Sequence, residues 1–287
     1  MELGRRRLLK FGAFATVVAL AACTTATGPA PKVSMPGGKV EVQWLGQSTT
    51  KITTPGGKII VIDPFMTGNP KTPAEYKDLA KLGKVDLILV THGHGDHTGD
   101  VAALHKLTDA MVAGNSDLVQ NMVALGWVPA AKTTRFNMSG SIRPLGPGIT
   151  ITQVEATHSS DITVTDPATK KPTVHAGGSA CGFIVELENG FRIYHMGDTG
   201  LFSGLRLIGR YYAPDLIMIP IGGHFVMDPV AAAYATNHYL KPKYAIPFHY
   251  GTIPVLAGTP QEYQQALGST STRVFPINPG EKVTFPL

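Results

Sequence analysis

A cluster of imidazole and carboxylate side chains follows an aliphatic run about a third of the way along the chain. The run 85–90 reads VDLILV, and a short aliphatic run of this kind is typical of a buried β-strand. Directly after it comes the segment THGHGDH, which contains His92, His94, Asp96 and His97. Imidazole nitrogens and carboxylate oxygens are common ligands of zinc and similar ions. The sequence therefore predicts a metal site at the carboxyl end of a strand.

The spacing within this segment separates its ligands into two groups. Side chains alternate along extended chain, so His92 and His94 project to the same side and can share one ion. Asp96 and His97 are adjacent and cannot both point there, which suits them to a second ion nearby. The two intervening glycines allow the backbone to turn tightly. A solvated histidine-rich loop is the alternative, and four potential ligands within six positions after a buried strand argue against it.

The pattern HxHxDH in residues 92–97 resembles the signature of the metallo-β-lactamase superfamily. The resemblance implies that further ligands follow later strands, where a rigid sheet holds them in place. The chain supplies three such residues, each after an expected strand: His158 after 149–155, Asp198 after 191–196 and His249 after 244–248.

The resemblance also implies how these ligands are divided. In such enzymes the first ion takes the two alternating histidines and the third histidine. The second ion takes the Asp-His pair and the last histidine, and one aspartate bridges both ions. Mapped onto this chain, the first site is His92, His94 and His158, the second is Asp96, His97 and His249, and the bridge is Asp198.

Several shorter segments resemble a narrower family of metal-dependent hydrolases. Its members include ascorbate-6-phosphate lactonase and N-acylphosphatidylethanolamine phospholipase D. The segments are IDPF at 62–65, TGNP at 67–70, GD at 99–100, ATHSS at 156–160, PIGGHF at 220–225 and PFHYGT at 247–252. The resemblance covers about residues 39–287 and implies a fold but not a substrate. The chain departs from these relatives at Gln47, where they often carry histidine. Glutamine can also donate a hydrogen bond, but it does not titrate near neutral pH.

The implied fold is an α/β four-layer αββα sandwich, metallo-β-lactamase-like, with two similar halves. The hydrophobic patterning agrees, because each half of the chain reads as strands followed by helices with ligands at strand ends. Strands are expected at 40–45, 50–54, 58–62, 85–90, 110–113, 149–155, 182–188, 191–196, 216–220, 244–247, 273–275 and 282–285. Helices are expected at 73–80, 99–107, 117–125, 201–210, 229–240 and 260–267.

The ligand set points to hydrolysis by a metal-activated water. Two divalent cations bridged by one oxygen lower the pKa of that water and give hydroxide at neutral pH. The ions also polarise the scissile carbonyl or phosphoryl oxygen, and no Gly-x-Ser-x-Gly or catalytic-cysteine segment is present. Asp96 would bind the second ion and help to orient the hydroxide. Zinc suits the histidine-rich first site, while the carboxylate-bearing second site tolerates manganese or iron.

We therefore expect a dinuclear metal-dependent hydrolase that acts on a small-molecule ester, lactone or phosphodiester. A β-lactamase-type amide hydrolase is the alternative enzyme, although the short segments resemble the other branch more closely. A non-catalytic metal-binding lipoprotein is the third hypothesis, and the seven-ligand set argues against it.

Five further residues are candidates for supporting roles. His224 lies in a Gly-Gly-His-Phe loop and is either a pocket residue, as proton donor or substrate contact, or a structural hydrogen-bonding residue. His175 lies in the polar loop 161–178, which could cover the pocket as a lid. His195 is expected to be buried and to support Asp198, and Asp63 either accepts a hydrogen bond from a ligand histidine or caps a turn. Cys181 is expected to be a small core residue.

The first residues of the chain predict export and lipid attachment. Arginines at 5–7 precede twelve apolar residues, 11–22, which are too few to span a bilayer as a helix. The following LAAC, ending at Cys23, resembles a bacterial lipoprotein cleavage box. We expect a twin-arginine lipoprotein signal at 1–22, lipid on Cys23, a flexible tether at 23–38 and the metallo-hydrolase domain at 39–287. A plain secretory peptide cut elsewhere and an uncut anchor are the alternatives.

Composition limits the partners. The net charge of +5 includes four basic residues and one acid within residues 1–22, so the remainder carries +2. No basic run or interleaved aromatic stripe follows, which argues against nucleic acid as a partner. Membrane contact is expected only through the lipid, on the periplasmic or cell-surface side, and nothing in the sequence specifies an oligomeric state. The two cysteines, at 23 and 181, form no disulfide if Cys23 is acylated.

Replacing Cys23 tests the predicted anchor. Cys23→Ser should abolish lipid attachment and release the protein from membranes, because the lipid is attached to the cysteine sulfur. Arg5→Lys combined with Arg6→Lys should block export. Incorporation of radiolabelled lipid and membrane fractionation measure both effects, and label that persists in the Cys23 variant would refute the anchor.

Overall fold

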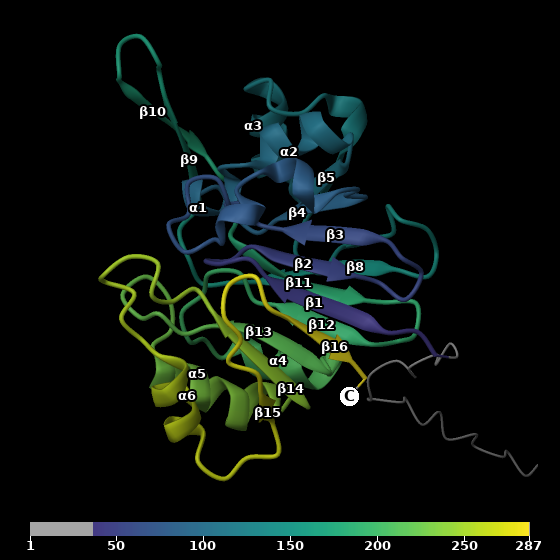
Figure 1. Ribbon diagram of the computed structural model, residues 1–287, viewed down its shortest axis with the longest axis vertical. Coiled ribbons are helices and arrows are strands. Elements are labelled where there is room, and N and C mark those ends of the chain that lie inside the picture. The colour runs from purple at the N-terminus through teal and green to yellow at the C-terminus, as the bar shows by residue number, and fades with distance from the viewer. Residues whose placement is uncertain (1–36, 287) are drawn as a thin grey trace, which may run out of the picture.

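The computed structural model describes residues 37–286, shown as coloured ribbon in Figure 1. The predicted signal, Cys23 and nearly all of the predicted tether lie outside these residues. Among the helices that are described, none has the length and apolar character needed to cross a membrane.

The first of two large sheets combines antiparallel and parallel strands. Its strands run antiparallel from β16 to β3 and parallel from β3 to β6. The spatial order is β16 (Lys282–Phe285), β1 (Val40–Trp44), β2 (Thr50–Thr53), β3 (Ile59–Ile62), β4 (Leu87–Val90), β5 (Met111–Asn115) and β6 (Thr133–Phe136).

The second sheet repeats this arrangement with the second half of the chain. Its strands run antiparallel from β7 to β12 and parallel from β12 to β15. The two halves are thus similar, as the sequence predicted. The order is β15 (Arg273–Val274), β14 (Tyr244–Phe248), β13 (Leu216–Pro220), β12 (Arg192–His195), β11 (Cys181–Glu186), β8 (Thr150–Glu155) and β7 (Ser141–Ile142).

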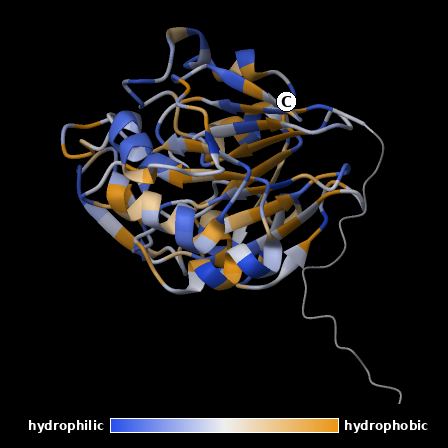
Figure 2. Ribbon diagram, turned by 90° about the horizontal axis from the view of Figure 1, so that it is seen from below, coloured by the Kyte–Doolittle hydropathy of each residue, from blue (hydrophilic) through white to orange (hydrophobic). Residues whose placement is uncertain are grey.

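Helices cover the outer face of each sheet and complete the four layers (Figures 1 and 2). Apolar side chains of α2 (Val101–Thr108) and α3 (Ser116–Ala124) pack on the first sheet. Those of α4 (Gly204–Tyr212), α5 (Pro229–Tyr234) and α6 (Pro260–Leu267) pack on the second. The predicted αββα sandwich is confirmed.

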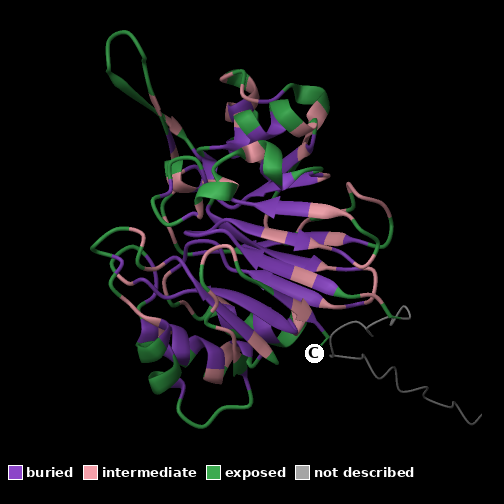
Figure 3. Cartoon of the chain, viewed as in Figure 1, coloured by how far each residue is buried: buried purple, intermediate pink, exposed green. Residues whose placement is uncertain are grey.

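The largest core cluster lies between the two sheets, where strand residues are buried on almost every position (Figure 3). Alternate residues of β1, β3 and β4 face alternate residues of β11, β12 and β13 across this layer. Phe183 is fully buried there, and its ring stacks on Phe136 with centroids 6.0 Å apart. Cys181 is also fully buried in this cluster, and burial raises the pKa of its thiol well above the ordinary value, in keeping with the predicted core role.

Some local predictions were wrong. The expected helix at 73–80 is two short 3₁₀ helices, Ala74–Tyr76 and Leu79–Leu82, and the helix expected at 229–240 changes after α5 into a π-helix, Ala235–Leu240. Strands β6 and β7 were not predicted, because both are short and lie at sheet edges.

The polar segment 161–178 does not form the predicted lid. It contains a hairpin of β9 (Asp161–Thr165) and β10 (Pro172–Ala176), which projects away from the sheets (Figure 1). The base of the hairpin is fixed because Ile162 is buried and Asn121 donates a hydrogen bond to the carbonyl oxygen of Ala176. His175 pairs with Ile162 within this hairpin, so it is a strand residue.

Phe183→Ala tests the core between the sheets. Removing this buried ring should lower the free energy of unfolding by about 3–5 kcal/mol, because it leaves a cavity in a packed layer. Leu207→Ala is the matched control, since that side chain is 69% exposed and its removal should have little effect. Urea denaturation of both variants at one metal concentration gives the comparison; equal losses would contradict the core assignment.

Candidate metal centre

Loops at the carboxyl ends of four strands bring the predicted ligands together. The loop after β4 supplies the HxHxDH residues, and the loops after β8, β12 and β14 supply one ligand each. The structure forms two clusters in which the potential ligand atoms all lie within 4.8 Å of one another. The first contains His92, His94 and His158, and the second contains Asp96, His97, Asp198 and His249.

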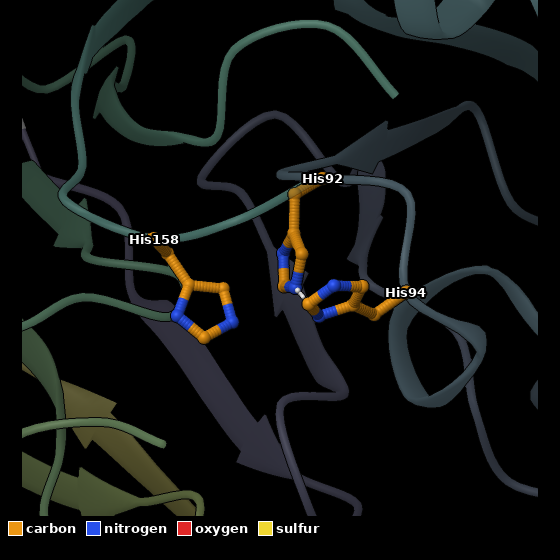
Figure 4. A group of neighbouring side chains, drawn as sticks. All are labelled: His92, His94 and His158. Carbon is orange, nitrogen blue, oxygen red and sulfur yellow. Dashed lines mark hydrogen bonds between the residues drawn. The ribbon is translucent and has the colours of Figure 1, made fainter. Parts of the chain in front are cut away.

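The three histidines of the first cluster point toward one another from two separate segments of chain (Figure 4). His92 Nε2 lies 3.0 Å from His94 Nδ1. The other nitrogen of His92 lies 3.0 Å from the hydroxyl oxygen of Thr91, which itself donates a hydrogen bond to Asp63. Because that hydroxyl proton is already used, His92 Nδ1 donates to Thr91, and the lone pair of Nε2 is directed into the cluster.

A single turn of helix explains how adjacent residues reach the second cluster. His94 is extended, with φ −62° and ψ 149°, and helix α1 (Gly95–Thr98) begins directly after it. The turn carries Asp96 and His97 away from the side that His94 faces, so the predicted division of the motif is present. Gly93 is required for this path, because a Cβ there would lie 2.6 Å from the carbonyl oxygen of Asp161.

The second cluster surrounds a buried carboxylate. His249 Nε2 lies 2.9 Å from Asp198 Oδ2, and His97 Nε2 lies 3.3 Å from Asp198 Oδ1. The same carboxylate reaches toward the first cluster, because its Oδ2 atom lies 3.6 Å from His158 Nε2. Asp198 thus lies between the two groups, as expected for a bridging ligand.

The charges of these residues shift one another's pKa values. Burial alone would raise the pKa of Asp198, but the adjacent rings of His249 and His97 hold it well below its ordinary value. Burial would lower the pKa of His249, whereas the charge of Asp198 and hydrogen bonds to Asp198 and Asp96 raise it to about 9. Burial and the charge of His97 lower the pKa of His92 well below its ordinary value. His92 is therefore neutral, with a lone pair available to an ion.

The donor set fits divalent metal ions. His97 Nε2 and Asp198 Oδ1 are both buried. Their own 3.3 Å contact lacks the geometry of a hydrogen bond, and neither atom has a hydrogen-bond partner within residues 37–286. A buried polar atom without a hydrogen-bond partner destabilises the folded state. Here the two atoms belong to an imidazole and a carboxylate, which can both bind a metal ion. Three histidines on one side and two histidines with two carboxylates on the other are donor sets that zinc, manganese and iron accept.

Residues around the clusters fix the orientation of the ligands. Asp63 accepts a hydrogen bond from His97 Nδ1 at 2.8 Å, which leaves His97 Nε2 for an ion and matches one of the two predictions for Asp63. His195 is buried; its Nε2 donates to the carbonyl oxygen of Ser48, and its Nδ1 accepts from the amide of Gly197, which precedes Asp198. The predicted support of Asp198 by His195 is therefore indirect, through the backbone.

Two residues, Gln47 and Asp161, contact predicted ligands in ways that the sequence did not predict. Gln47 Nε2 lies 2.8 Å from Asp96 Oδ2 and 2.8 Å from His249 Nε2, so this residue touches two members of the second cluster. Asp161 Oδ1 lies 3.4 Å from His94 Nε2 and is suited to orient that ring. The HxHxDH pattern gave no signal for Asp161, because the residue begins strand β9, far from that pattern in sequence.

A cavity of about 590 Å³ lies over both clusters. Its lining includes the side chains of His94, Asp96, His158, Asp198 and His249, so its floor consists of predicted ligands. His224 is exposed and lies outside the lining residues, with its ring edge against the ring of Phe225. Its neighbour Phe225 does line the cavity, which the sequence did not predict.

Comparisons with known proteins agree with this geometry. The Beta-lactamase superfamily domain matches residues 58–250. A UPF0173 metal-dependent hydrolase of Cupriavidus necator is 54% identical over 94% of this chain and 97% of its own length. A second, from Roseiflexus sp., is 39% identical over 86% of this chain and 98% of its own length.

Solved structures show the same relationship. Igni18, a metallo hydrolase from the hyperthermophilic archaeon Ignicoccus hospitalis, is 32% identical and superposes with a TM-score of 0.73, covering 87% of this chain and 99% of its own. The chain therefore belongs to the beta-lactamase superfamily and is a metal-dependent hydrolase similar throughout the described domain to the UPF0173 proteins.

Proposed function

We propose that the protein binds two divalent ions, one in each cluster, and hydrolyses an ester, a lactone or a phosphodiester. The observation that carries this proposal is the position of Asp198, whose carboxylate lies within 3.6 Å of a histidine from each cluster. A carboxylate with two oxygens in this position can bind both ions at once. Zinc suits the all-histidine cluster, and manganese or iron also suits the cluster with carboxylates.

The ions, when bound, acidify a coordinated water and polarise the substrate oxygen. The residues of the chain then position the reactants. Asp96 is suited to orient the attacking water, because its side chain is 35% exposed and lines the cavity. Gln47 Nε2 holds Asp96 by a hydrogen bond to Oδ2, which leaves Oδ1 to accept a hydrogen bond from that water.

His224 remains our proposed proton donor to the leaving group. It is exposed, and its ring contacts the ring of Phe225, which lines the cavity. A group in this position can exchange protons with solvent while the ligands below it stay occupied. For the whole chain, we propose an exported lipoprotein, with the catalytic domain tethered through a lipid on Cys23.

The number of ions tests the dinuclear arrangement. Fully loaded wild-type protein should contain two divalent ions per chain, and Asp198→Ala should lose the pair because the bridge is removed. Asp166→Asn is the control, since this exposed carboxylate lies outside both clusters, accepts hydrogen bonds from neighbouring backbone amides, and its loss should leave the ions bound. Elemental analysis of the folded proteins measures the content. One ion or none in the wild type would overturn the dinuclear proposal.

A turnover screen tests the reaction class. The metal-loaded protein should hydrolyse at least one of a set of aryl esters, lactones and phosphodiesters, and should lose this activity after chelation, because the proposed reaction depends on a water that the ions activate. β-Lactams belong in the same screen. Turnover of β-lactams alone would replace our proposal with amide hydrolysis.

Histidine variants separate ligands from the proposed proton donor. His158→Ala and His249→Ala should lose metal and nearly all turnover together. His224→Ala should keep both ions and lower turnover by roughly 10²–10⁴, the usual scale for a general acid. Metal content and rate measured on the same preparation decide the role. An unchanged rate would make His224 structural, and lost metal would make it a ligand.

A further inference from the structure

Apolar side chains form most of the wall of the cavity over the clusters. Its lining residues that are not predicted ligands come from loops after several strands. They are Gln47, Phe65, Gly68, Pro70, Ser159, Phe225, Thr252, Ile253 and Leu256. Six of these nine are apolar or glycine, and the three polar ones are uncharged.

Positive charge is absent from this wall. Within residues 37–286, no lysine or arginine lines the cavity, and its only charged side chains are those of the predicted metal site. Lys71 is adjacent to Pro70 in the sequence, but it lines a different cavity behind the loop 251–260. A substrate with a phosphate or carboxylate away from the reacting bond would therefore find no cationic side chain in this wall to pair with.

Two large apolar side chains are exposed at the mouth of the cavity. Phe225 is 53% exposed and Ile253 is 45% exposed, and they come from the separate loops that follow β13 and β14. Exposed apolar side chains around a concave site are typical of ligand-binding positions, because a bound apolar group removes them from water.

Two of the residues that line the cavity carry an uncharged polar atom with no hydrogen-bond partner among the described residues. These atoms, Gln47 Oε1 and Thr252 Oγ1, are both buried. The Thr252 hydroxyl can donate to a carbonyl or alcohol oxygen, and Gln47 Oε1 can accept from a hydroxyl. The oxygens of an ester or lactone can accept from the Thr252 hydroxyl, and Gln47 Oε1 suits a hydroxyl elsewhere on such a substrate.

We infer that the substrate is a neutral carboxylic ester or lactone whose apolar group lies against Phe65, Phe225 and Ile253. This inference rests on the proposed hydrolytic function and narrows it. The oxygen of water adds to the carbonyl carbon, and the bond from that carbon to the alkoxy oxygen breaks. One proton of the water goes to the alkoxy oxygen, so an ester gives a carboxylic acid and an alcohol, and a lactone gives one hydroxy acid.

A chain-length series tests this substrate class. We would measure kcat/KM of the metal-loaded protein for 4-nitrophenyl acetate, butyrate and octanoate, for the hemisuccinate as a charged counterpart of butyrate, and for bis(4-nitrophenyl) phosphate. We expect kcat/KM to rise by up to about fourfold for each methylene that enters the cavity. The hemisuccinate should react more slowly than the butyrate, and the phosphodiester more slowly than the esters.

Single-residue variants test whether the cavity wall causes the preference for longer acyl chains. Phe225→Ala should lower the ratio of octanoate to acetate kcat/KM without loss of metal. Leu207→Ala is the control, since this exposed residue does not line the cavity over the clusters and its loss should leave the ratio as in the wild type. Lys71→Met should leave the rate with bis(4-nitrophenyl) phosphate unchanged, and a fall would show that Lys71 binds anionic substrates.

Binding of 2-decanone tests the apolar wall without turnover. This ketone has the carbonyl and the apolar chain of an ester but no bond that can be hydrolysed. Calorimetry should detect its binding to wild type and weaker binding to Phe225→Ala. Faster turnover of the phosphodiester, or a flat chain-length series, would overturn the substrate inference while leaving the hydrolytic function intact. No turnover of any ester, lactone or phosphodiester by protein with two bound ions would instead overturn the proposed function.

Discussion

The buried carboxylate of Asp198 sets the electrostatic balance of the whole site. It lies beside His97 and His249 and is 3% exposed, so its charge must be balanced inside the protein. The raised pKa values of both histidines show that protons can provide this balance. A metal ion that binds the same nitrogens must displace those protons, which makes metal binding and proton release a single coupled event.

Holding these charges together requires the rigid convergence of strand ends. The ligands come from loops after β4, β8, β12 and β14, which belong to both sheets. Each half of the chain has antiparallel strands followed by parallel strands, so the carboxyl ends of the buried strands meet at one side of the sandwich. Because His158, Asp198 and His249 each follow closely after the end of a strand, the sheets hold their backbone positions.

The sequence predicted the local part of this site better than its long-range part. The spacing of His92, His94, Asp96 and His97 divided them into two groups, because alternation and a tight turn are local properties. The ligands His158, Asp198 and His249 were identified only through resemblance, since spacing alone does not bring together residues so distant in sequence. The structure thus brings the seven predicted ligands together in two clusters, and their binding of ions remains a prediction.

The sequence did not predict the hairpin β9–β10 or the orientation of the His224 loop, because both depend on long-range packing. The polar sequence of 161–178 predicts a loop, but the segment contains the hairpin β9–β10, whose strands pair only with each other. His224 was chosen for its type and its place in a loop, yet the structure lines the cavity with its neighbour Phe225. Side-chain direction in an irregular loop follows from backbone torsions, here a φ of 59° at His224, and the sequence does not fix these torsions.

Gln47 shows how one residue couples the two halves across the site. Its carbonyl oxygen accepts hydrogen bonds from the indole of Trp44 at 2.8 Å and from the amide of His249 at 3.1 Å. Its side chain amide reaches Asp96 and His249, so it contacts ligands from both halves of the chain. A histidine here would add a sixth imidazole ring to the five of the two clusters, whose charges already compete for protons. Glutamine provides the hydrogen bond to Asp96 without that charge, so the orientation of Asp96 does not depend on the protonation of residue 47.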